Sequence, residues 1–100
     1  MKNNPILHLN KAFESRIRLG IMSLLIIEGH IDFNALKERL GASDGNLATH
    51  IKGLEQKGYL KIVKRFINRK PNTTYHITPE GQTAFETHIK HLEELIKLKN

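Results

Sequence analysis

Residues 32–59 read DFNALKERLGASDGNLATHIKGLEQKGY, and this stretch contains two helical patterns separated by a very short connection. The first pattern ends at Gly41, the residue type that most readily takes the left-handed conformation at a helix C-terminus. The second pattern occupies residues 44–57 and follows Ser43, whose hydroxyl is suited to cap a helix N-terminus. The stretch therefore predicts two helices joined by a turn of three residues.

Further elements are expected on both sides of this helix pair, from the spacing of apolar residues and from cap and turn signals. In chain order they are a helix at 9–27, an extended piece at 30–33, strands at 59–67 and 74–77 joined by a turn at 68–73, and a last helix from 79 to about 99. We expect an α+β fold, mostly α, in which a helix-turn-helix pair is followed by a two-stranded hairpin and flanked by long terminal helices.

Composition limits the classes of protein that fit. One hundred residues with 39% hydrophobic content indicate a single domain over residues 1–100. The chain has no cysteine, which excludes disulfides and thiolate metal sites. The longest apolar run, residues 24–27, is too short to cross a bilayer, and we expect a cytoplasmic protein. The only paired carboxylates are Glu93-Glu94, which point in different directions on a helix, and no nucleophile elbow or phosphate-cradling glycine loop is found. Neither an enzyme nor a cofactor is therefore expected.

Positive charge is concentrated in the predicted hairpin. The chain has a formal net charge of +6, and its basic pI of about 9.8 favours a polyanionic partner. Between Leu60 and Tyr75 there are five cations and no Asp or Glu, namely Lys61, Lys64, Arg65, Arg69 and Lys70. This pattern predicts that the hairpin grips a polyanion. The alternative is a basic loop that serves only solubility.

The helix at 44–57 has a narrow apolar face and a small, polar outward face, as a helix that enters the major groove of DNA requires. The residues expected to contact DNA are Ser43, Gly45, Asn46, Thr49, His50 and Lys52 on this helix, and Lys64, Arg65, Asn68, Arg69 and Lys70 on the hairpin. Of these, Gly45 permits close approach, His50 keeps one nitrogen for a phosphate, and Arg69 enters a minor groove. Two short helices around a glycine turn are also ordinary packing, in which Ser43 is only a cap.

Asp44 opposes this prediction because an acidic residue in the first turn repels phosphates. Stabilisation of the helix dipole is the favoured explanation. The alternative is a contact with the amino group of a cytosine.

The last helix has an apolar stripe that can pair with a second copy of the chain. The expected dimer interface comprises Leu9, Phe13, Phe85, Ile89, Leu92 and Ile96. Packing of the same stripe against the chain's own first helix is the alternative. His88, His91 and Glu94 share another face of this helix, which we interpret as solvent-exposed surface rather than as a metal site, because further ligands would have to come from a partner.

Several short motifs resemble those of small archaeal or bacterial winged-helix transcriptional regulators of the MarR/ArsR type. They are Arg18-Leu19-Gly20-Ile21-Met22, Gly45-Asn46-Leu47 with His50 and Leu54, Gly58-Tyr59-Leu60, and Ile77-Thr78-Pro79-Glu80-Gly81. The resemblance implies a winged helix with a two-stranded β wing, dimerisation through the terminal helices, and operator binding by the third helix and the wing.

Together these observations predict a homodimeric regulator that binds double-stranded DNA sequence-specifically. The alternative is a winged-helix protein-interaction module whose hairpin docks an acidic protein. No membrane or metal partner is expected, and the sequence gives no indication of a small-molecule effector.

Overall fold

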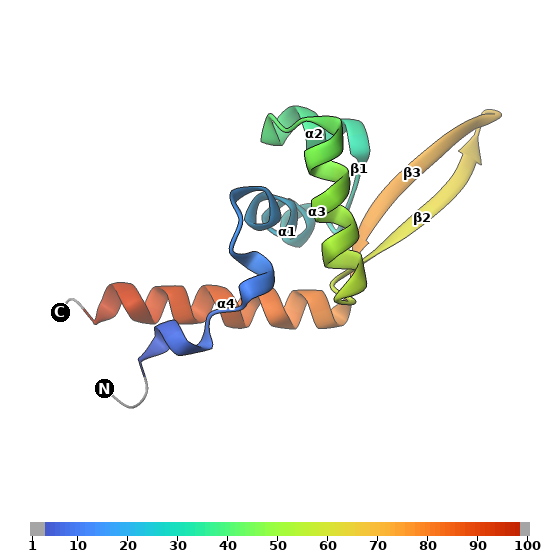
Figure 1. Ribbon diagram of the computed structural model, residues 1–100. Coiled ribbons are helices and arrows are strands. Elements are labelled where there is room, and N and C mark those ends of the chain that lie inside the picture. Colours follow the sequence, from blue (N-terminus) through green and yellow to red (C-terminus); the bar gives the residue numbers. More distant parts are fainter. Residues whose placement is uncertain (1–3, 99–100) are drawn as a thin grey trace.

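The computed structural model describes residues 4–98 (Figure 1). In chain order, its elements are the 3-10 helices η1 (Pro5–His8) and η2 (Lys11–Phe13), then α1 (Arg16–Glu28), β1 (His30–Asp32), α2 (Phe33–Leu40), α3 (Asp44–Gln56), β2 (Leu60–Ile67), β3 (Lys70–Ile77) and α4 (Pro79–Lys97). The mostly helical α+β fold expected from the sequence is therefore confirmed. The expected end of the last helix at Lys99 lies outside the described residues.

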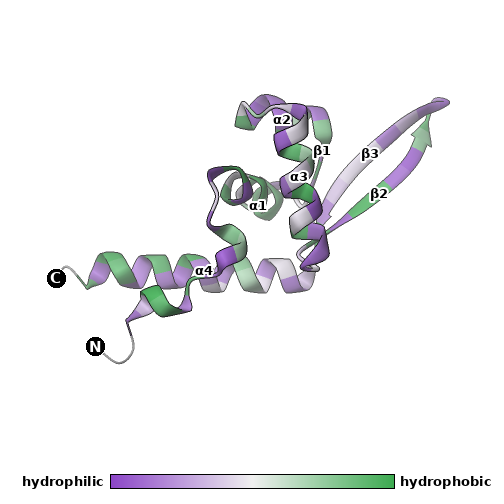
Figure 2. Ribbon diagram, in the orientation of Figure 1, coloured by the Kyte–Doolittle hydropathy of each residue, from purple (hydrophilic) through white to green (hydrophobic). Residues whose placement is uncertain are grey.

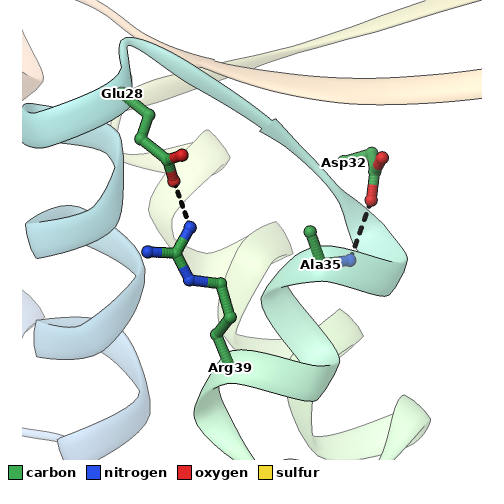
Figure 3. Close-up of polar contacts among 4 residues, drawn as sticks. All are labelled: Glu28, Asp32, Ala35 and Arg39. Atoms are coloured by element: carbon green, nitrogen blue, oxygen red, sulfur yellow. Dashed lines mark hydrogen bonds and ion pairs between the residues drawn. The ribbon is translucent and has the colours of Figure 1, made fainter.

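Local capping chemistry sets the boundaries of α2 and the start of α3, as the sequence predicted for Gly41 and Ser43. The Asp32 carboxylate accepts a hydrogen bond from the Ala35 amide at 2.8 Å, and an ion pair between Glu28 and Arg39 joins the end of α1 to α2 (Figure 3). Gly41 ends α2 with φ of 60°, in the left-handed region. The Ser43 hydroxyl then accepts from the Asn46 amide at 3.2 Å and starts α3.

The first helix begins later than the periodicity predicted. The first part of the expected helix from Leu9 is replaced by the 3-10 helix η2, and α1 starts only after Ser15, whose hydroxyl accepts from the Arg18 amide. Asn10 explains the interruption. Its side-chain oxygen accepts from the Ala12 amide at 2.9 Å, which competes with helical hydrogen bonding. Its own amide donates to Nδ1 of His88 at 3.0 Å, so the segment is held against α4.

The sheet has three antiparallel strands in the order β1-β3-β2. The extended piece expected at 30–33 is thus a third strand, so the two-stranded expectation holds only for the outer part of the wing. The expected turn at 68–73 was also too long. The chain reverses over Asn68 and Arg69 alone, both with positive φ, and β3 already begins at Lys70. Pro71 fits inside β3 because β1 pairs only with residues 74–76, which leaves that edge of β3 without a partner strand.

The hydrophobic core lies where α1, α3, the root of the sheet and the start of α4 meet. Phe13 is fully buried at its centre, with its ring 5.3 Å from the rings of Tyr59 and Phe85 and 5.2 Å from that of His88. Gly81 lets α4 approach closely, since a Cβ atom there would stand 1.9 Å from the Tyr59 carbonyl oxygen. This packing fixes the direction in which the hairpin leaves the body.

Candidate nucleic-acid interface

The outward face of α3 is open, while its inward face is buried in the core. Leu47, Ile51 and Leu54 are buried. The exposed residues of the outward face are Gly45, Asn46, Ala48, Thr49, Lys52 and Gln56. Outside the surrounding turn of α3, no atom of residues 4–98 lies within 4 Å of a Cβ atom built on Gly45, so the fold itself does not require glycine there. The expected base-reading face is therefore free to meet a partner.

Polar contacts within the protein occupy part of the first turn of α3. The Ser43 hydroxyl acts as the helix cap, and the Thr49 hydroxyl donates to the Gly45 carbonyl at 2.9 Å. Asp44 forms an ion pair with Lys37 at 2.8 Å, a partner that sequence reasoning missed. Its charge is thereby offset before any phosphate approaches. The amide of the Asn46 side chain and the ammonium of Lys52 have no such internal contact among residues 4–98.

His50 lies on the flank of α3 that faces α1, where the side chain of Arg18 extends from α1 to contact it. Nε of Arg18 donates to Nδ1 of His50 at 3.0 Å. Burial lowers the pKa of His50, and the neighbouring Arg18 cation lowers it further. The ring is therefore neutral near pH 7 and carries its hydrogen on Nε2, because Nδ1 is an acceptor. The motif around Arg18 was visible in the sequence, but its contact with α3 was not.

Arg18 is a half-buried cation with no counter-ion in the described part of the chain. Its guanidinium packs over Gly53, where a Cβ atom would stand 2.2 Å from Nη2, and donates to the Ala12 carbonyl at 3.4 Å. Within residues 4–98, no carboxylate lies within ion-pairing distance of it. Arg18 is thus an unneutralised cation beside α3, and the Nε2–H of His50 is a further donor on the same flank.

The hairpin carries the five predicted cations on exposed positions. Lys61, Lys64, Arg65, Arg69 and Lys70 are all exposed, and none is paired with a carboxylate in the described part of the chain. Asn68 and Arg69 have φ of 52° and 66°, the conformation of a type I′ turn. Glycine usually occupies the second of these positions, so Arg69 is held in a conformation that L side chains rarely adopt.

A groove of about 610 Å³ separates α3 from the hairpin. Its walls come from both elements and from Phe33 of α2. The other lining residues are Ala48, Ile51, Lys52 and Glu55 of α3, Ile62 and Lys64 of β2, and Thr73 and Tyr75 of β3. A helix with a free face and a cationic ribbon therefore border one hollow. The major groove of B-DNA is about 12 Å wide and admits such a helix. A ribbon beside the helix then reaches the sugar-phosphate backbone that flanks the groove.

The expected dimer interface is only partly available. Phe13 and Phe85 are buried inside the chain's own core and cannot face a partner, because the apolar stripe of α4 first serves intramolecular packing. Leu9, Ile89 and Leu92 are half-buried, and Ile96 is 73% exposed. Hydrophobic residues alternate with hydrophilic ones along the far end of α4 and in η1 (Figure 2), and Ile6, Leu7 and Leu98 are also exposed.

The prediction that His88 is exposed to solvent was wrong. His88 is buried, accepts from the Asn10 amide and packs edge-on against Phe13. His91 lies 3.6 Å from Glu94. Within residues 4–98, no cluster of three or more histidine and acidic side chains is arranged to hold a metal ion. The helices of this part of the chain are also too short or too polar to cross a membrane.

Comparison with known proteins assigns the chain to a class of DNA-binding domains that fits this geometry. Residues 17–96 match the family of winged helix DNA-binding domains, and the chain belongs to this family. It is 38% identical over 87 residues to an uncharacterized protein of Methanocaldococcus jannaschii, covering 87% of this chain and 95% of the relative. The resemblance to small winged-helix regulators is confirmed.

Two solved structures extend the similarity. A transcriptional regulator homologue from Pyrococcus horikoshii superposes with a TM-score of 0.89 at 27% identity, covering 100% of this chain and 99% of that one. A putative transcriptional regulator, ytfH, from Salmonella typhimurium has a TM-score of 0.71 at 29% identity, covering 88% of this chain and 77% of that one. The chain is thus similar to transcriptional regulators over nearly its whole described length.

Proposed function

We propose that this protein is a cytoplasmic, homodimeric transcriptional regulator that binds double-stranded DNA sequence-specifically, with residues 1–100 forming one domain. The observation that carries the proposal is the pairing of two surfaces beside one groove. One is the free polar face of α3, and the other is a hairpin with five cations and no counter-ions among residues 4–98. Uncompensated cations on paired strands repel one another and gain from a polyanion.

In this proposal α3 enters the major groove. Asn46 and Thr49 contact base edges, and Gly45 lets the helix backbone approach them. Lys52 meets the phosphates from the wing side of α3. Arg18 donates to a phosphate on the opposite flank, together with His50.

The wing supplies the remaining contacts. Arg69, at the tip, enters the minor groove, where narrow A·T tracts concentrate negative potential. Lys64, Arg65 and Lys70 bind the backbone, and Asn68 contributes a polar contact beside them. These roles give the wing a large share of the affinity and α3 most of the sequence preference.

A dimer would place two such units on one duplex. The exposed apolar residues at the far end of α4, with those of η1, support pairing at the end of the molecule opposite the wing. Two-fold symmetry then predicts a pseudo-palindromic site with half-sites about 34 Å apart, one turn of DNA.

The first test selects duplexes from a random pool with the purified protein and measures binding over a range of salt. If a dimer neutralises about eight phosphates, the logarithm of the binding constant falls against the logarithm of salt concentration with a slope near −7. Failure to enrich any duplex, or a slope near zero, would contradict the proposal. Saturable binding to an acidic protein without preference for a duplex would instead favour the protein-interaction alternative.

The second test separates the two surfaces. Changing Arg69 and Lys70 together to Ala should weaken binding to all sequences and flatten the salt dependence, because phosphate contacts are lost. Thr49→Ala or Asn46→Ala should leave the salt slope unchanged and relax the preference among selected sites. If the double variant bound as tightly as the wild type, the wing would have no role in binding.

A further inference from the structure

The hairpin presents an aromatic side chain that the fold does not use. Phe66 is 75% exposed near the end of β2, whereas Phe13 and Phe85 are buried and Phe33 is half-buried. An exposed aromatic ring forgoes the favourable burial that such a side chain normally obtains. Phe66 is therefore available to a partner.

The strand register shows which way this ring faces. Side chains alternate between the two faces of a strand, so residues 62, 64 and 66 share one face of β2. Ile62 and Lys64 line the groove toward α3. Their cross-strand partners Tyr75 and Thr73 line it as well, and the next pair along the same face is Phe66 with Pro71. Phe66 and Pro71 thus extend the α3-facing side of the hairpin beyond the groove.

The turn geometry brings the two side chains together. A two-residue turn is closed by a hydrogen-bonded pair, here Ile67 with Lys70. The following pair, Phe66 with Pro71, is then a non-hydrogen-bonded pair. Side chains lie closer together in such pairs than in hydrogen-bonded pairs. The missing amide hydrogen of Pro71 interrupts no ladder there, and its fixed backbone supports the aromatic ring.

The charge around this pair indicates the occupant. Arg65, Arg69 and Lys70 are its neighbours along the hairpin, and there is no Asp or Glu from Gln56 to Pro79. An apolar tip inside a purely cationic ribbon complements a duplex, which offers phosphates at its surface and apolar base faces between its steps. With α3 in the major groove, the tip of the hairpin reaches the adjacent minor groove.

We propose that Phe66, supported by Pro71, is an apolar wedge that enters this minor groove, partly unstacks one base step and bends the duplex. The inference rests on the proposed DNA-binding function and deepens it. It adds to the charged contacts of the wing a contact that depends on how easily a base step deforms. Flexible pyrimidine–purine steps are then preferred at that position, although no base edge is read there.

The experiment compares Phe66→Ala with Ile67→Ala, a matched truncation one residue away on the opposite face of the hairpin, where Ile67 is 46% exposed. The probe is a duplex recovered by selection, labelled at its ends with a donor and an acceptor dye to report bending by energy transfer. Phe66→Leu tests rescue by another apolar side chain. Thermal unfolding of each variant verifies that the fold is retained.

Wild-type protein should shorten the distance between the duplex ends, and Phe66→Ala should abolish most of that change. Its affinity should fall about 10-fold or more with an unaltered salt slope, because every cation remains. Ile67→Ala and Phe66→Leu should resemble the wild type.

The wedge proposal is contradicted if the wild type leaves the duplex straight or if Phe66→Ala bends it as much as the wild type does. It is also contradicted if Ile67→Ala reduces bending as much as Phe66→Ala does. Normal DNA binding by Phe66→Ala would assign the exposed ring to a protein contact instead. Absence of binding to any duplex by the wild type is a different result, and it contradicts the proposed function itself.

Discussion

Arg69 combines a cation with a backbone conformation that suits glycine. Its φ of 66° lies in the left-handed region, where a side chain other than Gly or Asn is unfavourable by about 1 kcal/mol. Arg69→Gly should therefore raise the free energy of unfolding by about 0.5–1 kcal/mol. It should also weaken DNA binding, because a minor-groove cation is lost. Chemical denaturation measures the gain in stability, and a binding titration measures the loss of DNA affinity.

Asn68→Gly is the matched control for this variant. It relaxes the neighbouring turn position, with φ of 52°, and leaves all five cations in place. Its salt slope should equal that of the wild type. If Asn68→Gly flattened the salt slope as much as Arg69→Gly, the charge of Arg69 would not be the property that matters.

Gly45 and Gly81 both occupy the first turn of a helix, yet they should respond oppositely to alanine. Gly81→Ala should destabilise the fold by about 1–3 kcal/mol, because its Cβ atom would collide with the Tyr59 carbonyl oxygen. The Cβ atom added by Gly45→Ala would point into open space. This variant should have a slightly higher free energy of unfolding and a lower affinity for DNA. Thermal unfolding and a binding titration test this pair. Equal DNA affinity of Gly45→Ala and the wild type would contradict close approach of α3 to the bases.

At the scale of elements, the sequence predicted the parts of the fold that depend on local chemistry. The start and end of α2 and the start of α3 depend on Asp32, Gly41 and Ser43, and each acts within three or four residues of its own position. The N-terminal segment could not be predicted in this way. Its path depends on contacts of Asn10 with His88 and Tyr59, which lie 78 and 49 residues away in the sequence.

The same distinction applies to the candidate site. Helical periodicity was sufficient to predict that Thr49 and Lys52 are exposed on α3. It could not show that Arg18 of α1 crosses to His50, because that contact depends on the angle between two helices. Apolar periodicity likewise cannot distinguish burial in the chain's own core from burial in a dimer. For this reason it assigned Phe85 to the wrong surface.

The hydrogen bond from the N-terminal segment to α4 makes the stability depend on pH. Burial lowers the pKa of His88, and nearby His91 lowers it further, while Glu14 acts in the opposite direction. Neutral Nδ1 accepts from the Asn10 amide, and a protonated ring could not. Since the unfolded chain binds the proton more readily, this stabilisation is complete above the ordinary histidine value of about 6.5 and is lost as the pH falls below it.

Denaturation at a series of pH values tests this dependence. The free energy of unfolding should fall by up to about 1.4 kcal/mol per pH unit for each histidine that remains neutral only in the folded state. The pKa values of His50 and His76 are lowered too, so they contribute in the same direction. His88→Gln removes one titrating group and should give a shallower dependence. An unchanged slope in that variant would show that His88 does not titrate in this range.

At the scale of the whole molecule, the two proposed binding surfaces lie at opposite ends. The described chain extends 57 × 26 × 21 Å, with the wing at one end and the exposed apolar residues of α4 and η1 at the other (Figure 1). Such an arrangement lets two copies join without covering α3 or the hairpin. A dimer formed there increases DNA affinity, because the second half-site is bound in an intramolecular step.

Ile96 allows a direct test of this arrangement. It is 73% exposed at the far end of α4, and Ile27, at the end of α1, is 75% exposed and serves as a matched control. Ile96→Asp should give a monomer by sedimentation, because a charge buried in an apolar interface is strongly unfavourable. It should keep the fold but bind a two-half-site duplex at least about 10-fold more weakly. Ile27→Asp should remain dimeric with unchanged binding. If Ile27→Asp instead gave the monomer, the dimer would form through α1, close to the helices that contact DNA, and the half-site spacing would have to differ from one turn.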